Sequence, residues 1–222
     1  MIKSFLIFIS FSTLLFGSQQ IILVVADDFN SSTASLSCFE GKKRYYHHIK
    51  VNLGHNGLGW GIGKEQIPHK SDEPIKHEGD KKAPAGVFTL STLFGTIKNQ
   101  AFSMFYLLAT PDLLCIDDST SKYYNTLQSH PFGAKSFEHM RRKDHLYDLG
   151  IRVNHNDIAK KGAGSCIFLH IQRGDNMPTA GCTSMKASDL YKLAHWLDKE
   201  KNPLLIQITK EYLPYIKSKY LH

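Results

Sequence analysis

The chain has 222 residues, of which 42% are hydrophobic and 11% aromatic, and its formal net charge at pH 7 is +7. This length and composition exclude a disordered chain and predict a folded globule with a sizeable core. The lysines are scattered without a nucleic-acid-binding motif, so the charge does not indicate a nucleic-acid partner. Attraction to anionic cell-wall groups and a generally basic proteome are both open explanations of the charge.

Residues 1–17 have the pattern of a secretory signal. Lys3 supplies a positive start, an apolar run follows, and Gly17 or Ser18 offers a small residue for cleavage. An uncleaved membrane anchor is the alternative, although polar residues interrupt the run and it is short for a span. We therefore expect export to the periplasm or cell envelope, a domain at residues 18–208 and a C-terminal tail at 209–222.

The rest of the chain predicts a mainly β domain with one or two helices. The glycine-rich segment 54–63 predicts a loop, and it lacks the helix and lysine of a phosphate-binding loop. Apolar residues recur with helical spacing over 188–198, where Ser188 is the candidate N-cap. A short terminal helix could begin at Pro214. Strands are predicted at 20–27, at 44–54, from Val87, at 103–109, at 113–117, around 149–154, at 165–171 and at 202–208.

The segment "FLHIQRGDNMPTAGCTSM" (168–185) combines residues that suit cysteine acyl transfer. His170 lies near the end of a predicted strand, and Gly181 permits a sharp turn before Cys182. Backbone N–H groups of Gly181, Cys182 or Thr183 are candidates for an oxyanion hole. Pairing with an imidazolium would lower the pKa of the thiol. Spacing alone leaves a structural histidine and an inert buried thiol as the commoner interpretation.

The same segment resembles the active-site segment of the L,D-transpeptidase (YkuD-like) family. That signature has a histidine, a variable loop, a small or hydroxylic residue, another residue, then Gly and Cys, which His170 and residues 179–182 match. The resemblance covers roughly residues 50–208. The cysteine is followed by Thr183 rather than by the nearby Arg or Asn of many members. The resemblance also includes the segments "GHNGLGWG", "EGDKKAPAGVFTL", "CIDDSTSKYYN", "EHMRR" and "GSCIFLHI".

The resemblance implies a sandwich-like β-rich catalytic domain acting on peptidoglycan stem peptides, without a metal or cofactor. Cys182 would attack the diaminopimelate carbonyl of a tetrapeptide stem and release D-Ala. His170 would be the general base and acid, with a backbone carbonyl orienting its second nitrogen. Transfer to an amine gives a cross-link, whereas transfer to water makes an L,D-carboxypeptidase. A non-catalytic wall-binding or scaffold protein, with cell-wall or envelope proteins as partners, is the remaining alternative.

Several further residues are candidates for the substrate cleft. We expect Arg173, Asn176 and Thr179 in the loop before the cysteine to contact the substrate, with solvated loop residues as the alternative. His155 and Arg141 are weaker candidates, for which a structural role is equally defensible. Cys166 is expected to be a packed core thiol, with a regulatory disulfide to Cys182 as the alternative. The histidines form no compact metal-ligand motif.

Overall fold

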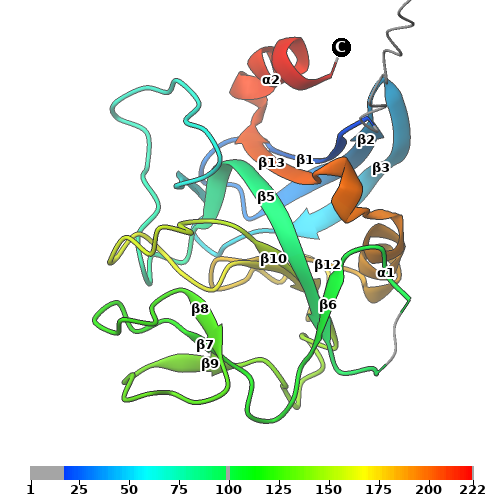
Figure 1. Ribbon diagram of the computed structural model, residues 1–222. Coiled ribbons are helices and arrows are strands. Elements are labelled where there is room, and N and C mark those ends of the chain that lie inside the picture. Colours follow the sequence, from blue (N-terminus) through cyan, green and yellow to red (C-terminus); the bar gives the residue numbers. More distant parts are fainter. Residues whose placement is uncertain (1–17, 99–100, 222) are drawn as a thin grey trace, which may run out of the picture.

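The computed structural model describes residues 18–98 and 101–221, and the predicted signal at residues 1–17 lies outside them. The described chain is mainly β with two α-helices (Figure 1), which confirms the predicted mainly β content with one or two helices. The strands are β1 (Gln20–Ala26), β2 (Thr33–Glu40), β3 (Lys43–Asn52), β4 (Leu58–Trp60), β5 (Ala83–Gly95), β6 (Phe105–Leu108), β7 (Leu114–Ile116), β8 (Thr126–Gln128), β9 (Phe137–His139), β10 (Leu149–Val153), β11 (Phe168–Ile171), β12 (Thr183–Met185) and β13 (Leu204–Thr209). The α-helices are α1 (Ala187–Trp196) and α2 (Leu213–Tyr220), with short 3₁₀ helices at Lys199–Lys201 and Lys210–Tyr212.

Eight of these strands close into a barrel. The order of paired neighbours is β1, β2, β3, β12, β11, β10, β5 and β13, and β13 returns to pair in parallel with β1. Strands β4 and β6 pair with the long β5 outside this ring. Because β1 and β13 come from opposite ends of the described chain, their pairing brings both ends together to close the barrel.

A separate three-stranded sheet, β8-β7-β9, covers one end of the barrel, and α2 lies at the opposite end (Figure 1). The main core fills the barrel and includes the apolar face of α1, where Leu190, Leu193 and Ala194 are buried. A second cluster of buried residues contains Phe94, Met140, Tyr147, Cys166, Phe168 and Cys182. Its members come from the barrel and from the chain around the small sheet, so this cluster joins the two.

One disulfide bond strengthens that junction. Cys115 on β7 is bonded to Cys166, which precedes β11. The prediction that Cys166 is a packed thiol, or a partner of Cys182, is therefore wrong. The sequence did not indicate this pairing, because 51 residues separate the two cysteines. Cys38 and Cys182 are free and buried.

Several predicted boundaries change in the structure. The strand predicted at 165–171 begins only at Phe168, because Cys166 has a φ of 55° that interrupts extended backbone. Ser188 is not the N-cap of α1; Lys186 holds that position without a side-chain hydrogen bond. The glycine-rich segment contains the short strand β4 as well as loops. The tail helix begins at Leu213, one residue before the predicted proline.

Candidate active site

The candidate site is a cavity of about 780 Å³ whose wall includes both His170 and Cys182. One part of the wall comes from β11 and from the turn before β12. The other parts come from the segment 76–81 and from β9 with the chain that follows it. Strands β11 and β12 are parallel neighbours, with Leu169 opposite Thr183. This pairing places the turn that carries Cys182 beside the strand that carries His170.

The turn that carries Cys182 depends on Gly181 and Thr179. Gly181 has a φ of 152°, and an added Cβ would lie 3.2 Å from the carbonyl oxygen of Lys82. The Thr179 hydroxyl donates to the Cys182 carbonyl oxygen at 2.6 Å and accepts from the Gly181 N–H at 3.1 Å. The Gly181 amide is thus engaged within the turn, and Thr179, predicted to contact substrate, also holds the turn together.

The sulfur of Cys182 is enclosed by backbone groups. The Phe168 N–H donates to Sγ at 3.4 Å, and the thiol donates to the Cys166 carbonyl oxygen at 3.6 Å. The residue is 8% exposed, although it borders the cavity. Because Cys166 is in the disulfide, the small sheet is linked covalently to a residue that touches the candidate nucleophile.

The imidazole of His170 is fixed by two contacts. Nδ1 lies 2.8 Å from the carbonyl oxygen of Ile171, and because a carbonyl only accepts, Nδ1 carries the proton. Nε2 is then the basic nitrogen of the neutral ring. The Tyr147 ring packs edge-on against the imidazole, with 5.3 Å between ring centroids. The backbone carbonyl that the family resemblance implied is therefore present.

Burial keeps both His170 and Cys182 neutral. Burial and, to a smaller extent, the nearby Arg142 lower the pKa of His170 to about 4, against the opposing effects of the Ile171 carbonyl and Asp144. Burial also raises the pKa of the Cys182 thiol to about 12, with Glu138 acting in the same direction. The expected imidazolium–thiolate pair is therefore not the resting state, because desolvation disfavours both charged forms. Proton transfer from sulfur to His170 would accompany attack on a substrate.

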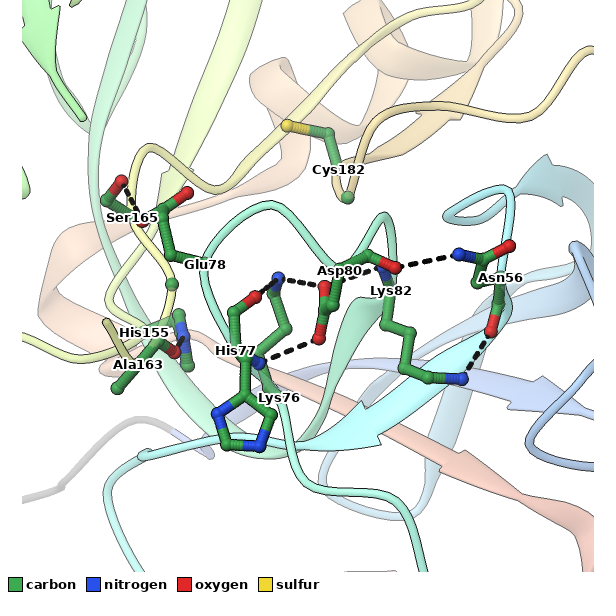
Figure 2. Close-up of polar contacts among 12 residues, drawn as sticks. Asn56, Lys76, His77, Glu78, Asp80, Lys82, His155, Ala163, Ser165 and Cys182 are labelled. Atoms are coloured by element: carbon green, nitrogen blue, oxygen red, sulfur yellow. Dashed lines mark hydrogen bonds and ion pairs between the residues drawn. The ribbon is translucent and has the colours of Figure 1, made fainter. Parts of the chain in front are cut away.

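A polar turn formed by residues 76–82 lies beside Cys182 (Figure 2). Lys76 is 4% exposed, and its Nζ donates to the His77 carbonyl oxygen at 2.6 Å and to Asp80 Oδ1 at 2.5 Å. Asp80 also accepts from the backbone N–H groups of His77 and Lys82. The positive charge of Lys76 lowers the pKa of Cys182, against the larger effect of burial.

The cavity wall carries charges of both signs. Glu78, Asp117 and Glu138 contribute carboxylates, whereas Arg142 and Arg173 contribute guanidinium groups. Both arginines also face Asp144, with the nearest N–O distances 2.6 Å for Arg142 and 3.6 Å for Arg173. The wall therefore suits a ligand with both carboxylate and ammonium groups.

The predicted cleft residues divide into two groups. Arg173, Asn176 and Thr179 line the cavity. The structure does not bring Arg141 or His155 to its wall: Arg141 is exposed, and its neighbour Arg142 lines the cavity instead.

His155 and Thr183 are enclosed by protein. His155 is 1% exposed, its Nε2 contacts the Ala163 carbonyl oxygen at 2.9 Å (Figure 2), and its Nδ1 has no partner among the described residues. Thr183 is 2% exposed, and its hydroxyl donates to Gln207 Oε1. Both side chains therefore serve the packing of the domain.

The sequence alone did not indicate five further residues of the cavity wall: Lys76, Glu78, Glu138, Arg142 and Tyr147. Glu78 belongs to "EGDKKAPAGVFTL", and Glu138 and Arg142 belong to "EHMRR", so quoted segments already contained three of them. Lys76 lies just before the first of these segments, whereas Tyr147 lies in none. Only tertiary contact distinguishes these residues from neighbours of the same type.

Comparison of the chain with protein-family models, with curated proteins and with solved structures finds no match. Within residues 18–98 and 101–221, no group of three or more His, Cys, Asp or Glu side chains is placed to hold a metal ion. No helix in this part of the chain has the length and apolar character needed to cross a membrane.

Proposed function

We propose that this protein is an exported peptidoglycan L,D-transpeptidase with the catalytic fold of that family. The observation that carries the proposal is that His170 on β11 and Cys182, in the turn directly before the neighbouring parallel strand β12, both line the wall of one cavity. Oriented by Ile171, the neutral imidazole presents a basic nitrogen, as removal of a thiol proton requires. The family resemblance supplies the substrate class.

In the proposed reaction, Cys182 attacks the carbonyl of the L-centre of diaminopimelate in a tetrapeptide stem. His170 takes the thiol proton and returns it to the departing D-Ala amine, leaving a thioester on the sulfur. An amine of another stem then takes the acyl group and forms a 3–3 cross-link. The charged cavity wall supports this substrate, because stem peptides carry carboxylates and a free amine.

The disulfide supports the exported location. Disulfides persist in oxidising compartments such as the periplasm and are rare in the cytosol. Cys115 and Cys166 form such a bond, and it ties the small sheet to the barrel beside Cys182. Cell-wall or envelope proteins are then accessible partners.

The test is intact-protein mass spectrometry of the purified domain after incubation with a diaminopimelate-containing tetrapeptide or muropeptide. We expect an acyl adduct and D-Ala release that Cys182→Ala abolishes and that Cys38→Ala, a change at the other free cysteine, preserves. Analysis of the products separates cross-linking from trimming by water. A folded, reduced-thiol protein that gives neither adduct nor D-Ala with several stem peptides would favour the scaffold alternative.

A further inference from the structure

Tyr147 occupies a central place beside the candidate catalytic pair. It is 5% exposed, lines the cavity and belongs to the same buried cluster as Cys182. Its ring packs against His170 and against Phe168, at centroid distances of 5.3 and 5.6 Å. The Phe168 N–H is in turn bonded to the cysteine sulfur. The tyrosine therefore contacts the base and the residue that holds the nucleophile.

The Tyr147 hydroxyl has a single proton and a carboxylate partner, Glu138, in the wall of the cavity that Cys182 also lines. It donates to Glu138 Oε2 at 2.7 Å. Burial raises the pKa of Cys182, whereas hydrogen bonding from Tyr147 lowers it. One phenolic proton cannot serve the carboxylate and a thiolate at the same time.

The other charged groups around the sulfur act in defined directions. Glu138 opposes a negative charge on Cys182, whereas Lys76 favours it. Arg142 lies over the Tyr147 ring, 5.0 Å from its centroid. His170 is neutral at neutral pH, because burial lowers its pKa to about 4. The Phe168 N–H already donates to the sulfur, and the Tyr147 hydroxyl, in the same buried cluster, can add a second hydrogen bond to a thiolate by reorienting.

We propose that Tyr147 is a further catalytic residue whose hydroxyl turns from Glu138 to donate a hydrogen bond to the Cys182 sulfur as the thiolate forms. The S–H bond breaks, the proton passes to Nε2 of His170, and the electron pair stays on sulfur. The catalytic part of this role rests on the proposed function. The stabilisation of the thiolate is a property of the free protein and is measurable without a substrate.

The test is the rate of Cys182 alkylation by iodoacetamide at fixed pH between 7 and 9, with the modified peptide identified by mass spectrometry to separate it from Cys38. Tyr147→Phe keeps the ring and should slow alkylation about tenfold or more, since a hydrogen bond to a charged group is lost. Glu138→Gln removes an opposing charge and should accelerate it several-fold. Tyr124→Phe is the matched control, because that buried hydroxyl donates to Glu78 instead, and its rate should equal the parent's.

A Tyr147→Phe rate equal to the parent's, or equal slowing by Tyr147→Phe and Glu138→Gln, would overturn the proposal. Circular dichroism and the thermal midpoint establish that each variant is folded. If Tyr147→Phe does not fold, acceleration by Glu138→Gln supports the proposal and an unchanged or slower rate overturns it. D-Ala release by the same proteins is scored separately. If the variants show the predicted alkylation rates but no D-Ala is released, only the proposed enzyme function is contradicted. If D-Ala is released but Tyr147→Phe does not change the alkylation rate, only the role of Tyr147 is contradicted.

Discussion

At the scale of single residues, the candidate site depends on backbone conformation as much as on reactive groups. Directly before Cys182, Gly181 adopts a φ of 152°, which residues with a Cβ rarely adopt. The Thr179 hydroxyl then fixes the turn from both sides of this glycine. The position of the Cys182 sulfur is therefore set by a turn that few other residues can form.

Gly181→Ala should damage the site more than the fold. The added Cβ is strained at this φ and meets the Lys82 carbonyl oxygen at 3.2 Å, so we expect a stability loss of about 1–3 kcal/mol. The shifted sulfur should lower the rate of Cys182 acylation at least tenfold, since small displacements of reacting groups are costly. The measurements are urea unfolding and the time course of the acyl adduct by mass spectrometry.

Gly133→Ala provides the control for backbone strain. Gly133 has a φ of 82°, no atom lies within 4 Å of its added Cβ, and it is far in sequence from the turn. Its variant should lose comparable stability and keep the acylation rate. Equal effects of the two substitutions on acylation would show that Gly181 has no special role in placing the sulfur.

At the scale of secondary-structure elements, the small sheet creates the cavity. Strand β9 contributes Glu138, and the chain between β9 and β10 contributes Arg142 and Tyr147. The disulfide from β7 to Cys166 fastens this sheet to the strand that carries the candidate base. Without the sheet, His170 and Cys182 would lose one wall of their enclosure.

The double variant Cys115→Ser/Cys166→Ser should be less stable by about 4 kcal/mol, the chain-entropy estimate for a loop of this length. Acylation should also slow, because the Cys166 carbonyl oxygen contacts the sulfur of Cys182. Urea unfolding and the adduct assay measure the two effects. Reduction of the parent protein with dithiothreitol should reproduce the loss, whereas an unchanged urea midpoint after reduction would contradict a stabilising role.

At the scale of the whole molecule, buried neutral histidines connect stability to pH. Burial lowers the pKa of both His155 and His170 to about 4, below the ordinary value of about 6.5. Between these two pKa values the unfolded chain binds more protons than the folded one. The free energy of unfolding is therefore not reduced by these histidines above pH 6.5, and it falls as the pH drops toward 4. Glu138 works in the opposite direction, because burial raises its pKa.

We expect acidification from pH 7 to pH 4 to cost roughly 3 kcal/mol for each of the two histidines. His155→Gln can keep a donor toward the Ala163 carbonyl oxygen and removes one titrating group, so it should reduce the loss by about half. Urea unfolding at several pH values across this range measures how steeply the free energy of unfolding changes with pH. An identical slope in parent and variant would show that His155 is not the source of the pH dependence.

Local patterns in the sequence determined much of the fold. Alternating and β-branched apolar runs located β1, β3, β10 and β13, and helical spacing located α1, because these signals depend only on near neighbours. The short strands β8, β9 and β12 were not predicted, because three residues are too few to show an alternating apolar pattern. Closure of the barrel was not predicted either, because it depends on pairing between strands far apart in the chain, β5 with β10 and β1 with β13.

The sequence by itself indicated His170, Cys182 and the glycine turn, because those residues lie within one short segment. Only the tertiary structure decided that Arg142 rather than Arg141 reaches the cavity, and that His155 is enclosed. It also decided the pairing of Cys115 with Cys166. Such contacts join residues far apart in the chain, and the pKa values of the buried groups follow from desolvation, which exists only once the barrel and the small sheet have packed together.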